Sequence, residues 1–205
     1  MSEEKMDKVH ELFEAAENLR IATVATLHRA PSTSERITLV GAYLDTVIEH
    51  HESVTMLIRA CRYGSAFALA RPIYEATLRG CWVNACASEE EVRQLRRADH
   101  HDRIIPRFGD LLSKLAVAYK LNEVQNSKTK WEALCSYTHT GLRQLGRRGF
   151  RGARQHGYSR KAIVEILDLT TSSLASLAKV YFVGSGNGIS ALFLTAIEKE
   201  YYAPI

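Results

Sequence analysis

Hydrophobic residues recur at steps of three and four positions along most of the chain, with charged residues between them. This spacing is typical of amphipathic helices. It predicts helices over residues 3–27, 33–60, 65–87, 88–97, 111–121, 131–145, 159–183 and 189–201. We find no alternating strand pattern, no repeat and no domain linker. The sequence therefore predicts one all-α domain over residues 1–205, a bundle of about six to eight helices, with residues 3–27 as a packing or dimerisation arm.

Three of the predicted helices begin with a capping signal. Ser32 with Glu35, and Ser88 with Glu91, have the spacing of a capping box. In that motif the serine hydroxyl and the glutamate carboxylate satisfy N–H groups that the first helical turn leaves unpaired. Ser159 is placed to cap the helix that follows it.

Proline, glycine and polar clusters predict where helices stop. Pro72 lies inside the most apolar segment, and its missing N–H predicts a kink there or a break near Ala70. The polar residues 122–128 and the glycine-rich residues 184–188 are predicted to form turns between helices.

The composition is that of an ordinary globular chain, with 46% hydrophobic and 24% charged residues. Lys and Arg outnumber Asp and Glu by 27 to 23, and the net charge of +4 permits an anionic partner without requiring one. The four cysteines form no CxxC pair, and the residues after Met1 are acidic, which indicates neither a disulfide framework nor export. No apolar run reaches the roughly 20 residues of a membrane helix. We therefore expect a cytoplasmic protein that does not enter a membrane.

Arg71, Glu75 and Arg79 follow one another at four-residue steps on the most apolar predicted helix. Buried charges are costly unless they are paired, so the spacing indicates an ion-pair ladder that sets helix register. The alternative is an anion or nucleotide pocket. In that pocket Arg71 would present its planar fork to a phosphate while Glu75 holds it in position.

His139 is the best general acid–base candidate in the chain, because imidazole titrates near neutral pH. It lies in the segment SYTHTGLRQLGRR, where Gly141 permits a close approach of backbone or ligand. Helical spacing predicts that His139, Arg143 and Arg147 share one face. A hydrogen-bonded structural histidine is the alternative. The phosphate-binding candidates beside it are Arg143, Arg147 and Arg148, and the supporting candidates are Ser136, Thr138 and Gln144.

Residues 142–164 hold seven Lys or Arg residues and no acid. This concentration of charge indicates a phosphate-binding surface, on which Phe150 and Tyr158 could stack on bases. A solvated basic loop is the alternative interpretation.

The run His100, His101, Asp102 resembles the HD pair of metal-dependent phosphohydrolases. Such a site would need a further histidine, His50 or His51, and a further aspartate, Asp168. We hold this as a third hypothesis and otherwise expect no metal and no cofactor. The GSGNG stretch at residues 184–188 lacks the flanking strand and Lys-Ser/Thr of a phosphate loop, which favours a simple turn.

The segments RYGSAFALARPIYEATLRGCWV and KWEALCSYTHTGLRQLGRR resemble bacterial HEPN-like proteins (higher eukaryotes and prokaryotes nucleotide-binding), over roughly residues 33–180. The resemblance implies a helical dimer. The superfamily includes metal-independent ribonucleases of toxin–antitoxin and phage-defence systems, as well as non-catalytic members. The ribonucleases carry an arginine and a histidine separated by four to six residues. Arg96 to His101 and Arg151 to His156 have this spacing but lie outside clear predicted helices.

The leading hypothesis is a homodimeric, HEPN-like protein that binds RNA or nucleotide phosphate, with metal-independent RNA cleavage as its candidate activity. A cognate antitoxin or defence protein is the expected partner. The second hypothesis is a non-catalytic interaction or sensor module, in which the polar groups only set packing. These two hypotheses differ in whether Arg71 and His139 come together where a ligand can reach them.

Overall fold

The computed structural model describes residues 3–27, 34–97, 104–120, 124–147 and 157–201. The described residues form helices and no strand, which confirms the predicted all-α bundle. The helices are α1 (Glu3–Leu27), α2 (Glu35–Arg59), α3 (Tyr63–Ala85), α4 (Glu89–Arg97), α5 (Phe108–Tyr119), α6 (Val124–Thr138), α7 (Leu142–Gly146), α8 (Arg160–Gly184) and α9 (Gly188–Tyr201). These nine exceed the predicted number by one, because the predicted helix over residues 131–145 is divided into α6 and α7.

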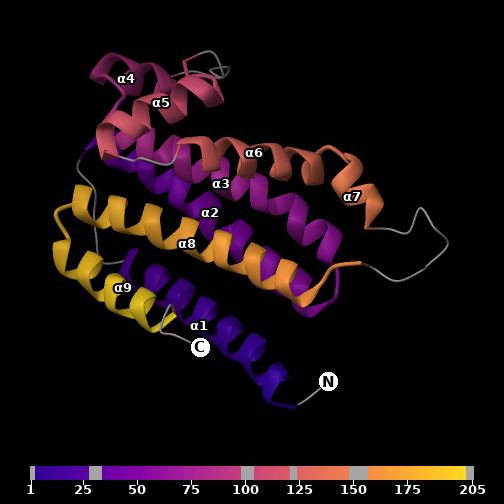
Figure 1. Cartoon of the computed structure of the whole chain (residues 1–205). Helices are drawn as coiled ribbons and strands as arrows, with labels where there is room; N and C mark the ends of the chain where they lie inside the picture. Colours follow the sequence, from indigo (N-terminus) through magenta and orange to yellow (C-terminus); the bar gives the residue numbers. More distant parts are fainter. Residues whose placement is uncertain (1–2, 28–33, 98–103, 121–123, 148–156, 202–205) are drawn as a thin grey trace.

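Helix α3 is the centre of the bundle (Figure 1). It packs against α2 and α8 on one side and against α5 and α6 on the other, while α1 and α9 cover the far side of α8. Helix α1 buries Phe13, Ala16 and Leu19 in the common core. Helix α1 therefore packs against the rest of the bundle.

Small residues on α3 let its neighbours approach closely. A Cβ added to Gly80 would lie 2.6 Å from Leu177 Cδ1 of α8 and 3.3 Å from Tyr43 Cβ of α2. Trp82 and Ile73 of the same helix are fully buried. This helix packs on several sides, which accounts for its almost entirely apolar composition.

Two of the three predicted caps are present. The Ser88 N–H donates to Glu91 Oε2 at 2.6 Å, and the Glu91 N–H donates to Ser88 Oγ at 3.2 Å. Ser159 Oγ accepts from the Ala162 N–H at 3.2 Å. The capping box at the start of α2 was wrong, because Glu35 is the first helical residue and the box requires the third. Ser32 itself lies outside the described residues.

A helix break near Ala70 and a turn over residues 124–128 do not occur. Helix α3 runs through Pro72 without a break near Ala70, because the packing of α3 on its neighbours outweighs the one backbone donor that proline removes. Helix α6 already begins at Val124, so residues 124–128 are helical rather than a turn. At Pro72, tertiary packing thus overrides local propensity.

Helix α8 is, among the described helices, the one long and apolar enough to cross a membrane by length and composition. However, 61% of its most apolar stretch is buried against other helices of the bundle. Burial in the core accounts for this composition.

Candidate functional site

Arg71, Glu75 and Arg79 form the predicted ladder along one face of α3. Glu75 Oε1 accepts from Arg79 Nη2, and Glu75 Oε2 lies 3.7 Å from Arg71 Nε. The three side chains are 19%, 24% and 30% exposed, in that order along the chain, so the ladder lies at the edge of the core. Glu75 therefore holds an arginine on either side of it.

His139 meets this ladder from the end of α6. Its Nε2 is in hydrogen-bond contact with Arg71 Nη1, across 68 positions of the sequence, and its side chain is exposed. A guanidinium has N–H groups to donate and no acceptor, so Nε2 is the acceptor here. The structure thus brings Arg71, Glu75 and His139 together at a solvent-exposed place.

Two aromatic residues that the sequence analysis did not single out hold Arg71 in place. The Arg71 guanidinium carbon lies 4.6 Å from the centre of the Trp131 ring, and Trp131 stacks on Phe108 at 3.9 Å with an interplanar angle of 13°. A cation over an indole is attracted by the ring. No hydrogen bond joins Arg71 Nη2 to a described residue. The guanidinium is therefore fixed by its neighbours but keeps donor capacity for a ligand.

The turn after α6 presents His139, and two of the supporting candidates build it. Thr138 Oγ1 donates to the Ala68 carbonyl of α3 at 3.1 Å, which ties the end of α6 to α3. Ser136 Oγ accepts from the Arg143 N–H at 3.1 Å and so closes the first turn of α7. A Cβ on Gly141 would lie 2.5 Å from Ser136 Oγ. The close approach expected at Gly141 is thus made by the chain itself.

The prediction that His139, Arg143 and Arg147 share one helical face was wrong. Helix α6 ends at Thr138, Thr140 adopts a left-handed conformation with φ of 53°, and α7 begins at Leu142. The apolar spacing continues through this turn, which is why periodicity did not reveal it.

Arg147 is a structural residue of an aromatic cluster. Its Nε donates to Tyr137 Oη at 3.0 Å and its Nη1 donates to the Gly157 carbonyl at 2.9 Å. Its guanidinium carbon also lies 5.0 Å from the ring centre of Tyr158, which packs against Phe67. Tyr158 is buried, so the expectation that it stacks on bases was wrong. Arg147 joins the end of α7 to the start of α8.

Gln144 and Arg143, the remaining described candidates, lie on α7. Gln144 is buried, and its Nε2 donates to the Gly64 carbonyl at 3.4 Å, so it also serves the packing of α7 on α3. Arg143 is exposed and makes no side-chain ion pair with any described residue. Arg148 lies outside the described residues.

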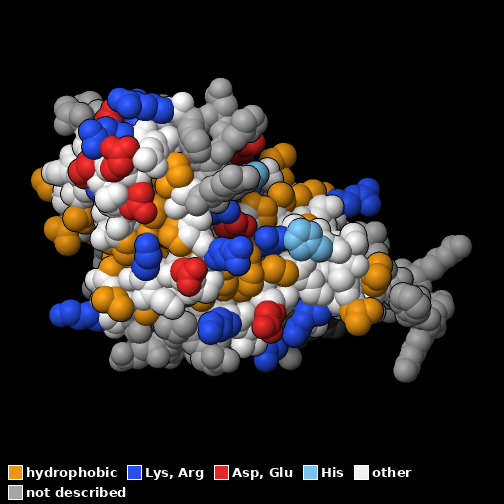
Figure 2. Space-filling model, turned by 90° about the horizontal axis from the view of Figure 1, so that it is seen from above, with side chains coloured by type: hydrophobic (Ala, Val, Ile, Leu, Met, Phe, Trp, Pro, Cys, Tyr) orange, Lys and Arg blue, Asp and Glu red, His pale blue; other side chains and the backbone are white. Residues whose placement is uncertain are grey.

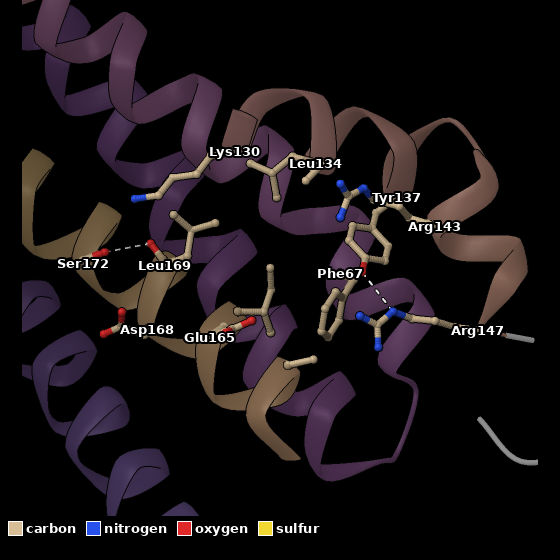
Figure 3. A pocket seen from close by; sticks show the side chains of 13 residues that line it. Phe67, Lys130, Leu134, Tyr137, Arg143, Arg147, Glu165, Asp168, Leu169 and Ser172 are labelled. Atoms are coloured by element: carbon tan, nitrogen blue, oxygen red, sulfur yellow. Dashed lines mark hydrogen bonds between the residues drawn. The ribbon is translucent and has the colours of Figure 1, made fainter. Parts of the chain in front are cut away.

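A pocket of about 400 Å³ lies between α6 and α8, beside the aromatic cluster (Figure 3). Lys130 and Arg143 line one side of it, whereas Glu165 and Asp168 of α8 line the other. The remaining lining residues are Phe67, Ala133, Leu134, Tyr137, Arg147, Ala162, Ile166, Leu169 and Ser172. Arg71 and His139 are not among its lining residues. The candidate phosphate-binding arginines thus lie at two places: Arg71 beside His139, and Arg143 and Arg147 at the pocket between α6 and α8.

Basic and acidic side chains are mixed on the described surface. On the face seen from above in Figure 2, Lys, Arg, Asp and Glu lie side by side with hydrophobic side chains between them. In the basic segment, Lys161 Nζ lies 3.9 Å from the Oε1 atom of Glu165, one turn later on α8. Phe150 and the arginines at 148, 151 and 154 lie outside the described residues. Within the described part, the Arg71–His139 pair is therefore a better candidate for a phosphate-binding site than a basic patch on the surface.

The metal hypothesis gains no support from the described residues. His51 is fully buried, its Nε2 lies 3.1 Å from Thr171 Oγ1, and burial lowers its pKa to about 4. It is therefore a core histidine rather than a metal ligand. No group of three His, Cys, Asp or Glu residues suited to a metal occurs in the described part. His100, His101 and Asp102 lie outside it, as do His156 and Arg151 of the HEPN spacing.

Comparison with known proteins gives a family but no activity. No curated protein and no solved structure matches the chain. A family model described as a family of unknown function, DUF6988, matches residues 44–201, which include α3, α6 and the turn that presents His139. Since the match covers more than half of the chain, the protein belongs to the family of unknown function DUF6988.

Proposed function

We propose that the protein binds phosphate groups of RNA or a nucleotide at the Arg71–His139 site, and that it cleaves RNA there without a metal. The observation that carries the proposal is the contact between His139 and an arginine held by Trp131 and Glu75. A guanidinium fixed before the ligand arrives loses little entropy on binding phosphate. An exposed imidazole beside it supplies the proton transfer that RNA cleavage needs.

The chemistry assigns one role to each side chain. His139 Nε2 takes the proton of the ribose 2′-hydroxyl, and the 2′-oxygen attacks the adjacent phosphorus. The bond from phosphorus to the 5′-oxygen breaks, and that oxygen takes a proton back from His139 or from water, leaving a 2′,3′-cyclic phosphate. Arg71 stabilises the negative charge that builds up on the phosphorane oxygens.

The proposal includes an assembly and a setting. We expect a cytoplasmic homodimer of HEPN type with a cognate antitoxin or defence protein as partner. The support for a dimer is an exposed apolar stripe on α9, formed by Ile189, Leu192 and Phe193. Unpartnered apolar side chains at such spacing are typical of a helix that packs against another subunit.

The test is a cleavage assay with total RNA in EDTA, read on a denaturing gel. We expect cleavage by the wild type and none by His139→Ala, while His10→Ala, which removes an exposed histidine of α1, cleaves as the wild type does. Arg71→Lys keeps the charge but loses the planar fork, so it should cleave poorly. Equal cleavage by the wild type and His139→Ala would rule out His139 as the proton-transfer group.

A non-catalytic module is the second candidate. It is favoured by Arg147, Gln144 and Thr138, whose polar groups are committed to packing. Binding of RNA by the wild type without any cleavage would favour this module over the enzyme.

A further inference from the structure

A second pocket, of about 470 Å³, opens beside α3, where α5 and α6 lie on one side and α8 on the other. Its apolar wall is formed by Leu78 of α3, Leu115 of α5, and Leu169 and Val180 of α8. Cys81 adds to this wall, because burial raises the pKa of its thiol to about 12 and keeps it uncharged near neutral pH. A pocket of this size and composition is typical of a site for a small ligand with an apolar body.

The charged side chains at this pocket are positive. Lys130 of α6 and Lys179 of α8 line it, and no acidic residue is among its described lining residues. The pocket beside the aromatic cluster differs in this respect, because Glu165 and Asp168 line it. Figure 3 shows the Lys130 side chain reaching from α6 toward Leu169 of α8. Lys130 is exposed, and no hydrogen bond or ion pair joins it to a described residue. The pocket therefore favours a ligand with a negative charge.

Hydroxyl groups of the wall offer little to such a charge. Ser172 Oγ and Ser173 Oγ both donate to the Leu169 carbonyl, at 3.1 Å and 2.7 Å. Thr77 Oγ1 donates to a carbonyl of its own helix at 2.9 Å. A hydroxyl that donates to the backbone presents only its lone pairs to the pocket, and lone pairs repel an anion. An anionic head group is therefore drawn to the exposed ammonium of Lys130 rather than to these hydroxyls.

We propose that this pocket binds an amphipathic anion, with its apolar chain between α5 and α8 and its anionic head group at Lys130. The apolar wall removes the chain from water, and the two lysines distinguish an anion from a neutral molecule of the same length. The inference goes beyond the proposed function and does not depend on it, because neither Arg71 nor His139 lines the pocket.

The experiment is calorimetric titration of the wild type with octanoate, butyrate and 1-octanol. We expect saturable binding of octanoate at a single site. Butyrate has a shorter chain that loses less apolar surface to the pocket, so it should bind about a hundredfold more weakly. The alcohol keeps the chain length but has no charge, so it should bind about tenfold more weakly. No saturable binding of octanoate, or binding of either other compound as tight as that of octanoate, would refute the inference.

Three variants locate the bound octanoate. Lys130→Glu removes an attraction and adds a repulsion, so it should weaken octanoate binding about tenfold. Lys128→Glu makes the same change of charge at an exposed residue of α6 that does not line the pocket, and should bind octanoate as the wild type does. Ser176→Trp places an indole at the exposed edge of the pocket without removing a buried side chain, and should block octanoate. Equal weakening by the two lysine variants, or wild-type affinity in Ser176→Trp, would place octanoate elsewhere and overturn the inference.

Discussion

Acid should destabilise the folded chain through His51. His51 is fully buried in the folded chain, and this burial lowers its pKa from 6.5 to about 4. Water reaches the imidazole when the chain unfolds. The unfolded state then binds a proton more readily than the folded state, so the free energy of unfolding falls as the pH drops below about 6.5. The free energy of unfolding lost through this difference in pKa is about 3 kcal/mol once the pH is below both values, and about 2 kcal/mol at pH 5.

Urea unfolding of the wild type and of His51→Gln at pH 7 and pH 5 measures this effect. Glutamine does not titrate, so the variant should lose about 2 kcal/mol less than the wild type over this interval, whatever its stability at pH 7. Glu17, whose pKa is lowered mainly by its hydrogen bond to Arg20, loses its stabilising effect only as the pH falls below about 4.5, outside the interval. Equal losses in both proteins would refute the assignment. An NMR titration of wild-type His51, expected to stay neutral at pH 5, checks the same point without a substitution.

Three further changes test the site and its support. Trp131→Leu removes the ring under the Arg71 guanidinium, a cation–ring contact worth about 1 kcal/mol. It should weaken binding of a 2′-O-methyl oligouridylate, which cannot be cleaved, roughly fivefold in a fluorescence titration. Gly141→Ala places a Cβ 2.5 Å from Ser136 Oγ, and should lower stability by about 1–3 kcal/mol in thermal unfolding. The variant should also fail to cleave RNA on the gel. Unchanged cleavage would show that the turn does not position the site. Arg147→Met should lower the free energy of unfolding in urea by about 1–3 kcal/mol. It should leave the salt dependence of 2′-O-methyl oligouridylate binding unchanged. A slope of log affinity against log salt concentration that falls by about one would instead identify Arg147 as a phosphate ligand.

Local signals predicted most of the helices but not every boundary. Ser88 with Glu91, and Ser159, cap helices through contacts within one turn, and both were readable from the sequence. The division between α6 and α7 was not, because hydrophobic spacing continues across it. The interruption is formed by Ser136, which accepts from the Arg143 N–H, and by the left-handed conformation of Thr140.

The candidate site shows the same division between local and distant contacts. Spacing of four residues placed Glu75 beside both arginines of α3, as the structure shows. The role of Arg147 could not be predicted in this way, because the groups that it contacts belong to α6 and to the turn before α8. A positively charged residue in a basic segment has the same sequence pattern whether it binds phosphate or packs on aromatic rings.

The sequence by itself determined that this chain is an all-α bundle and that Arg71, Glu75 and Arg79 form one ladder. Both depend on contacts within a turn or two, where helix geometry sets the distances. Only the tertiary structure decided that His139 contacts Arg71, that Trp131 and Phe108 stack beside it, and that Tyr158 and His51 lie inside. The reason is physical: these neighbours depend on the order and crossing of helices far apart in the chain, and periodicity along one helix carries no information about either.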